Sequence, residues 1–154
     1  MSNHGGMLPL SHRESSLREP AVSHGGKDGE GQARDPSLAV LVVDDEPLIR
    51  WSLRQGLVKR GHRVVEAETG AQALDLIAAM RPVFDVVILD YRLPDRRDLS
   101  LLAAIRESVP STTVLMMTAY SEPGMRQEAL ALGARAVVNK PFQVADFVSL
   151  VESL

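Results

Sequence analysis

Five polar side chains in this sequence share one kind of position, at or just beyond the end of a short apolar run: Asp44, Asp45, Asp90, Thr118 and Lys140. A short apolar run rich in β-branched residues is typical of a buried strand in a parallel sheet. The carboxyl ends of parallel strands meet at one edge, where open α/β folds bind their ligands. We therefore expect these five side chains to converge at that edge.

The chemistry that this set could carry is phosphoryl transfer. Three carboxylates at one edge repel one another unless a cation is present, and oxygen-only ligands suit Mg²⁺. An ionised carboxylate such as Asp90 can attack a phosphoryl group without a general base and form an acyl phosphate. Lys140 would supply a positive charge, and the Thr118 hydroxyl would donate to a phosphoryl oxygen. The pattern predicts that Asp90 becomes phosphorylated.

The elements that must position these residues alternate along the chain. Five strands are predicted, at residues 38–43, 62–68, 86–89, 112–117 and 136–138, each followed by a helix. Such alternation implies right-handed crossovers and a parallel sheet covered on both faces. The polar second strand suits an edge, and the three most apolar strands suit the centre. We therefore predict a three-layer, doubly wound (βα)5 sandwich of flavodoxin-like α/β type, with strand order 2-1-3-4-5.

Several residues predict where the helices begin and end. Pro47 suits the first turn of the first helix, and Gly61 ends it. Asp98 can cap the third helix through its carboxylate. Ser121 is predicted to cap the fourth helix, which would run through residue 132 and end at Gly133.

Residues 1–36 differ from the rest of the chain in composition. They hold six of the eleven glycines and three of the four histidines, with few apolar residues. Such a segment cannot offset its ordering entropy by burial, so we predict a disordered extension followed by one domain over residues 37–154. The histidines His4, His12 and His24 are too widely spaced for a compact metal site.

The composition of the whole chain limits its function and location. The net charge of −3 and the pI of about 5.8 give no indication of nucleic-acid binding. The chain has no cysteine, hence no disulfide and no thiol nucleophile. No apolar run approaches the ~20 residues of a membrane span, and the N-terminus has no signal-peptide core. These features fit a cytoplasmic protein.

Four short motifs resemble those of one family. The segments VVDDEP (42–47), ILDYRLP (88–94), MTAY (117–120) and NKPF (139–142) stand in the order found in the receiver domain of bacterial two-component response regulators. The resemblance covers about residues 37–154, and the motifs are specific as a set. IRWSL (49–53) is similar to receivers of the nitrogen-regulation type.

This resemblance implies a role for each site residue. Asp90 would be the phosphoacceptor, which receives its phosphoryl group from the phosphohistidine of a sensor histidine kinase or phosphotransfer protein. Asp45, Asp90 and the backbone carbonyl of Arg92 would bind Mg²⁺, with Asp44 holding the ion through water. Thr118 and Lys140 would contact the phosphoryl group and act in the switch. The Lys140–Pro141 peptide bond is expected to be cis.

Other positions either tune the family's chemistry or depart from its pattern. Arg92 and Tyr120 stand where the family tunes dephosphorylation. Leu99 replaces the usual glycine of the loop after the phosphoacceptor, so a different loop shape is expected, since leucine disfavours positive φ. Val137 replaces the aromatic residue that rotates on activation. The coupling between Thr118 and the face made by the fourth helix, the fifth strand and the fifth helix is then expected to differ, or to use Tyr120.

The sequence leaves two other functions open, and it also leaves open whether the chain is a stand-alone receiver or a fragment. The chain could be a receiver-like interaction module that phosphorylation does not control. It could also be a Mg²⁺-dependent phosphohydrolase, although one common phosphatase family needs a second Asp where this chain has Arg92. The sequence ends fourteen residues after Lys140. This fits either a stand-alone receiver with an unknown protein target or a fragment of a longer regulator.

Overall fold

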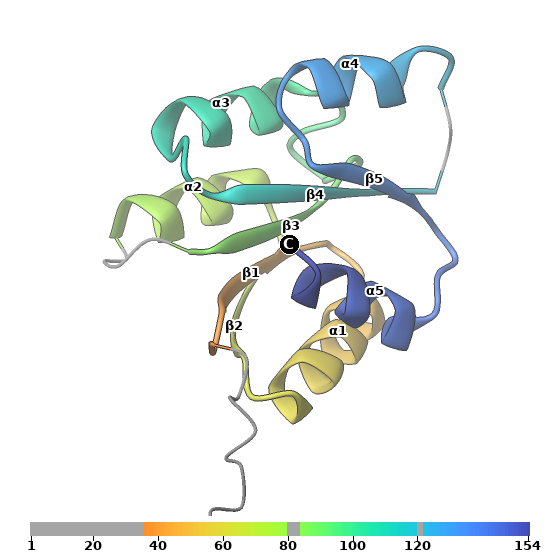
Figure 1. Cartoon of the computed structure of the whole chain (residues 1–154). Coiled ribbons are helices and arrows are strands. Elements are labelled where there is room, and N and C mark those ends of the chain that lie inside the picture. Colours follow the sequence, from red (N-terminus) through yellow and green to blue (C-terminus); the bar gives the residue numbers. More distant parts are fainter. Residues whose placement is uncertain (1–35, 80–83, 120–121) are drawn as a thin grey trace, which may run out of the picture. The chain divides into compact units, whose positions relative to one another are not determined.

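The computed structural model describes residues 36–79, 84–119 and 122–154, and five strands alternate with five helices along these ranges (Figure 1). The strands are β1 (Ala39–Val43), β2 (Arg63–Ala67), β3 (Val86–Asp90), β4 (Thr113–Thr118) and β5 (Ala136–Asn139). The helices are α1 (Pro47–Lys59), α2 (Gly70–Ala79), α3 (Ser100–Ser108), α4 (Met125–Ala131) and α5 (Val144–Glu152).

All strand pairs in the sheet are parallel. The strand order is β2-β1-β3-β4-β5, which confirms the predicted order and the flavodoxin-like α/β class. The polar strand β2 lies at one edge and the short strand β5 at the other. The three apolar strands lie in the centre, because strands covered on both faces need side chains that are apolar on both faces.

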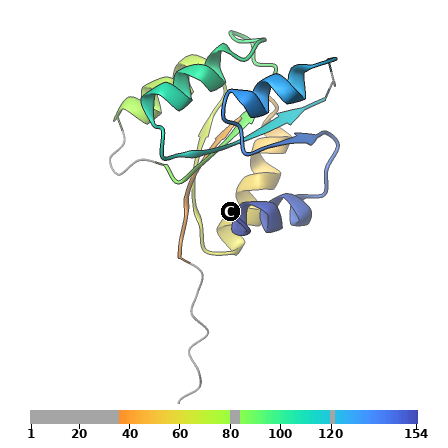
Figure 2. The ribbon, with the colours of Figure 1, turned by 45° about the horizontal axis from the view of Figure 1, so that its top comes forward.

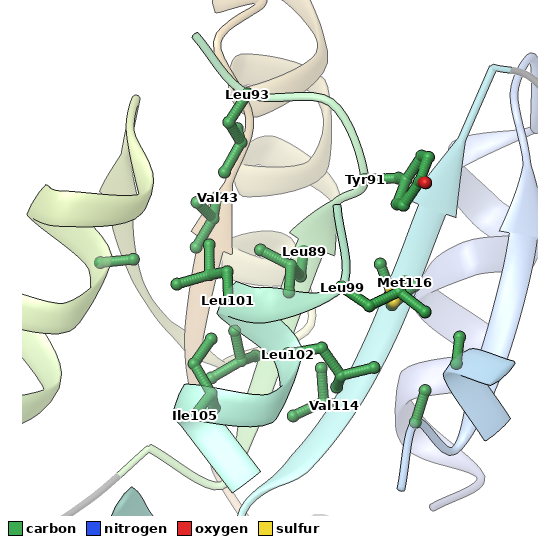
Figure 3. Close-up of a cluster of buried hydrophobic side chains, with 14 of the residues drawn as sticks. Val43, Leu89, Tyr91, Leu93, Leu99, Leu101, Leu102, Ile105, Val114 and Met116 are labelled. Atoms are coloured by element: carbon green, nitrogen blue, oxygen red, sulfur yellow. The ribbon is translucent and has the colours of Figure 1, made fainter. Parts of the chain in front are cut away.

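Helices cover both faces of the sheet, so that the domain has three layers. In Figures 1 and 2, α2, α3 and α4 lie on one face, whereas α1 and α5 lie on the other. Successive side chains of a strand point to opposite faces, which gives the domain two cores. Thus Leu89 packs with α3 residues such as Leu102 (Figure 3), and its neighbour Ile88 packs with Leu53 and Phe147 of the opposite layer.

A glycine allows α1 and α5, the two helices on one face of the sheet, to approach each other closely. A Cβ atom on Gly56 of α1 would lie 2.8 Å from Cγ1 of Val144 and 3.0 Å from Cγ2 of Val148, both on α5. The absence of a side chain at this position therefore lets α5 pack directly against α1.

The start of α4 differs from the prediction. Ser121 lies outside the described residues, but Glu122, Pro123 and Gly124 precede the helix, which begins at Met125. Gly124 has a φ of +82°, a left-handed conformation that cannot belong to a right-handed helix. A turn at Pro123 and Gly124 thus delays the helix, and the prediction that it starts after Ser121 was wrong.

Two further expectations meet the limits of the described ranges. The predicted disordered extension, residues 1–36, lies outside them except for Pro36. Within the described ranges, no helix is both long enough and apolar enough to cross a membrane.

Candidate functional site

The structure brings the carboxylates predicted for the site together at the carboxyl edge of the sheet. Asp90 is the last residue of β3, and Asp44 and Asp45 directly follow β1, which pairs with β3. Carboxylate oxygens of Asp44, Asp45, Glu46 and Asp90 lie within 4.8 Å of one another. Asp44 and Asp90 are buried, whereas Asp45 and Glu46 are exposed. The cluster therefore has a buried floor and an open rim.

Glu46 belongs to this cluster although the sequence analysis did not include it in the site. Its backbone N–H donates to Asp44 Oδ1 at 2.8 Å, which fixes the turn between β1 and α1. The run Asp44-Asp45-Glu46 carried the signal, because a third acid in the same tight turn must lie near the first two. Arg50 was also missed: from the first turns of α1 its guanidinium donates to the carbonyl of Asp44 at 2.6 Å.

Lys140 provides the positive charge of the site. Its Nζ lies 2.8 Å from Asp44 Oδ2, 3.2 Å from Asp90 Oδ2 and 3.4 Å from Glu46 Oε1. Burial works against the charged ammonium, but the carboxylates of Asp44 and Asp90 more than offset this and raise the pKa of Lys140 above its ordinary value. Lys140 therefore stays protonated and neutralises part of the carboxylate charge.

The surroundings of Asp90 strongly perturb its pKa. Burial and then the charge of Asp44 raise its pKa from 3.8 to about 6, although Lys140 and the backbone N–H of Arg92 oppose the shift. The Arg92 N–H lies 3.4 Å from Asp90 Oδ1, so this hydrogen bond is weak. One positive side chain therefore does not balance the acids around Asp90, and the cluster favours an additional cation.

The donor set fits a hard divalent cation such as Mg²⁺. All the candidate ligand atoms of the cluster are carboxylate oxygens, and Mg²⁺ binds through one or two carboxylates while keeping several waters. The open rim at Asp45 leaves room for such waters. Which side chains bind the ion, and whether the carbonyl of Arg92 joins them, stay predictions.

Thr118 lies at the same edge, as the last residue of β4. Thr118 is 2% exposed, and its backbone carbonyl accepts a hydrogen bond of 2.8 Å from the backbone N–H of Lys140. This bond ties the end of β4 to the residue that carries the ammonium. The next peptide bond, Lys140–Pro141, is cis. Tyr120, the other predicted tuning residue, lies outside the described residues.

Leu99 occupies its place without backbone strain. Its φ is −83°, its side chain is buried among α3 and β4 residues including Leu102 and Met116 (Figure 3), and it directly precedes α3. The N-cap residue of α3 is Leu99 and not the predicted Asp98, although Asp98 accepts a hydrogen bond of 2.9 Å from the backbone N–H of Ser100. The leucine thus contributes to the core in a negative-φ conformation, and no left-handed backbone is needed here.

Val137, at the position where an aromatic residue was expected from the family, is buried in β5. Its carbonyl accepts a hydrogen bond of 2.7 Å from the guanidinium of Arg126 on α4, and the same side chain reaches Asn139 Oδ1 at 3.4 Å. An arginine therefore connects α4 with β5 in this protein.

Comparisons with known sequences agree with this fold and site. The profile of the response regulator receiver domain matches residues 40–152. The chain is 37% identical over 113 residues to the DNA-binding transcriptional regulator NtrC of Escherichia coli (strain K12), which covers 73% of this chain and 24% of that protein. It is 34% identical over 113 residues to sporulation initiation phosphotransferase F of Bacillus subtilis (strain 168), covering 73% of this chain and 90% of that protein.

The lengths of these relatives differ greatly from one another. The chain also matches transcriptional regulatory protein KdpE of Mycobacterium tuberculosis (strain ATCC 25618 / H37Rv) at 40% identity over 110 residues, which is 71% of this chain and 47% of that protein. The match thus spans about a quarter of NtrC and about half of KdpE, but most of the sporulation phosphotransferase.

Solved structures give the same result. A CheY-like receiver domain protein from Methanospirillum hungatei JF-1 has a TM-score of 0.72 at 27% identity, covering 76% of this chain and 92% of that chain. The chemotaxis response regulator CheY4 of Vibrio cholerae has a TM-score of 0.69 at 30% identity, covering 76% and 98%. The profile match over most of the chain, the strand order and the acidic pocket lead to one conclusion: this chain belongs to the response regulator receiver domain family.

Proposed function

We propose that this chain is a signalling switch that accepts a phosphoryl group on Asp90 from a histidine kinase or a phosphotransfer protein. The observation that supports this best is the position of Asp90, a buried carboxylate 3.2 Å from the ammonium of Lys140 and within the acidic cluster. The carboxylate oxygen would attack the phosphorus of a phosphohistidine, the phosphorus–nitrogen bond would break, and the imidazole would leave with the bond's electron pair.

The residues around Asp90 have complementary roles in this proposal. Lys140 balances the charge that the phosphoryl group brings, and the Thr118 hydroxyl donates to one of its oxygens once β4 moves toward it. Asp45, Asp90 and the backbone carbonyl of Arg92 would bind a Mg²⁺ ion, and Asp44 would hold it through water. The bound ion would supply positive charge at the phosphoryl oxygens during transfer. The switch is then a shift between two conformations driven by about −1.5 to −2 added charges.

Labelling with a small phosphodonor tests the proposal. The protein is incubated with acetyl phosphate and Mg²⁺, and the intact protein is weighed by mass spectrometry. Wild type should gain the mass of one phosphoryl group, whereas Asp90→Asn should not. The absence of added mass on wild type, or equal labelling of the variant, would remove Asp90 as the acceptor.

Two alternatives are distinguished by separate experiments. A receiver-like module that phosphorylation does not control would bind its partner equally with and without beryllofluoride, a phosphoryl mimic. One solved structural neighbour of this chain is described as a beryllofluoride-activated receiver domain, of DrrB, with a TM-score of 0.68 and 28% identity. A phosphohydrolase would turn over a phosphate ester rapidly. Arg92 stands where one phosphatase family needs an acid, so slow release is expected instead.

A further inference from the structure

An ion-paired carboxylate holds the two residues that directly follow Asp90. Glu122, in the segment between β4 and α4, accepts a hydrogen bond of 2.8 Å from the guanidinium of Arg92 through Oε1. Its other oxygen, Oε2, accepts one of 3.2 Å from the hydroxyl of Tyr91. Both oxygens of one carboxylate are therefore bound by consecutive residues of the loop after the phosphoacceptor.

Tyr91 anchors this arrangement in the core, whereas the side chains of Arg92 and Glu122 are exposed. Tyr91 is 7% exposed, and its ring lies in the core near Met116 (Figure 3). Its backbone N–H also donates to the carbonyl of Met117 at 2.8 Å. The Glu122 carbonyl in turn accepts from the N–H of Met125 at the start of α4. Glu122 is thus held at its backbone and at one carboxylate oxygen, which leaves the second oxygen directed at Arg92.

From these contacts we propose that Glu122 is a positioning residue that holds the Arg92 side chain away from the phosphoryl group and thereby shortens the lifetime of phosphorylated Asp90. The inference rests on the proposed function. Arg92 is two residues from Asp90, so a guanidinium released from Glu122 can reach a phosphoryl group on that side chain. A dianionic phosphoryl group with three acceptor oxygens is a strong competitor for the guanidinium.

The effect on lifetime follows from the geometry of hydrolysis. Water must attack phosphorus in line with the breaking bond, from the solvent side opposite the Asp90 oxygen. The phosphorus–oxygen bond to Asp90 breaks, the carboxylate is restored, and inorganic phosphate leaves with the oxygen of the water, whose proton is lost to phosphate or solvent. A guanidinium bound to the outer phosphoryl oxygens covers that side. While Glu122 retains Arg92, the path of the water stays open.

The test compares Glu122→Gln with wild type. Glutamine keeps an acceptor for Tyr91 and leaves the backbone contact to Met125 intact, but removes the charge that competes for Arg92. Each protein is phosphorylated with acetyl phosphate and Mg²⁺ and exchanged into donor-free buffer, and the decay is followed by intact mass. We expect the half-life of the variant to be about two- to fivefold longer, because an exposed ion pair contributes only a modest free energy.

Arg92→Met and the double variant separate positioning from a general charge effect. If Glu122 acts through Arg92, then Glu122→Gln must leave the decay unchanged in the Arg92→Met background. Glu107→Gln, an equal charge change on the exposed side of α3, should also leave it unchanged. An unchanged half-life in Glu122→Gln, or an equal effect in both backgrounds, overturns the inference alone. A wild type that takes no phosphoryl group overturns the proposed function, and the inference with it.

Discussion

The ammonium of Lys140 lies closer to Asp44, at 2.8 Å, than to Asp90, at 3.2 Å. Lys140 is therefore shared between two buried acids, and its attraction for Asp90 is incomplete. Burial and then the charge of Asp44 raise the pKa of Asp90 to about 6, and the shared ammonium of Lys140 offsets only part of that shift.

We predict that Asp90→Asn stabilises the metal-free protein at neutral and higher pH. The pKa of Asp90 is about 6 in the folded protein and 3.8 in the unfolded protein, so ionisation of this carboxyl destabilises the fold. The destabilisation grows as the pH rises from 3.8 to about 6 and is complete above that range. At about pH 8 the free energy of unfolding of Asp90→Asn should exceed that of wild type by about 1 to 2 kcal/mol, a figure that allows for the lost contact with Lys140.

Urea unfolding in the presence of a chelator measures this difference. The advantage of Asp90→Asn should shrink as the pH falls from about 6 and disappear below 3.8, where the wild-type carboxyl is protonated in both folded and unfolded protein. Asp75→Asn, at an exposed position on α2, should have little effect at either pH. A variant less stable than wild type at high pH would show that Asp90 is not under electrostatic stress.

Lys140→Met should raise the pKa of Asp90 further above 6. The lysine lowers this pKa by its charge and by a hydrogen bond, and both are lost in the variant. A carboxyl-carbon NMR titration of the metal-free protein gives the midpoint directly. Lys59→Met, in the last turn of α1, should leave it in place. A midpoint that falls or stays constant in Lys140→Met would mean that Lys140 does not balance Asp90 in solution.

The two exposed acids of the cluster should differ in their effect on Mg²⁺ binding. Asp45→Asn should weaken binding on the order of tenfold or more, since loss of a carboxylate removes a ligand or its charge. Glu46→Gln should weaken it only about two- to threefold, because the Glu46 side chain is 59% exposed and its charge is screened by solvent. Isothermal titration calorimetry with MgCl₂ measures the Mg²⁺ affinity of both variants. Equal losses of affinity would contradict the assignment of Asp45 as a ligand.

An ion pair at the far end of the sheet should contribute stability that acid removes. Glu152 at the end of α5 accepts hydrogen bonds from Arg60 and lies 3.1 Å from His62 Nε2. Arg60 first, and His62 next, hold the pKa of Glu152 below its ordinary 4.5. Its stabilisation is therefore present above pH 4.5 and is lost as the pH falls through the depressed folded value.

Glu152→Gln should accordingly lower the free energy of unfolding by about 1 kcal/mol at neutral pH. The loss should disappear in strong acid, where wild-type Glu152 is protonated too. Thermal unfolding of both proteins across the acid range checks this, with Glu107→Gln as the matched control. A loss that persists unchanged at low pH would indicate a packing effect of residue 152 and not a charge effect.

The sequence predicted the sheet edge well because its information is local. A buried strand that ends in a carboxylate, as at Asp90, carries both its burial pattern and its polar end in a few adjacent letters, and parallel pairing then brings it near Asp44 and Lys140. Contacts between distant loops leave no such trace. Glu122 stands in a turn with no periodicity, so nothing in the sequence indicates that it meets Arg92 thirty positions earlier.

Other differences between prediction and structure have similarly specific causes. The predicted start of α4 is wrong because a serine favours a helix start locally, whereas the Pro123-Gly124 pair forms a turn whose left-handed glycine directly precedes the helix. Leu99 was expected to reshape its loop. In the structure its side chain is buried and its φ is negative, so leucine is accommodated at that place without a left-handed backbone.

The contact between Arg126 and the carbonyl of Val137 has a consequence for solubility. Strand β5 is the outer strand of the sheet, and an outer strand offers free backbone groups to any extended chain that approaches. A charged side chain that binds one of these carbonyls at 2.7 Å uses up an acceptor and places a solvated cation along the strand. Arg126 thereby protects the domain against adding a foreign strand at this border, a safeguard against aggregation.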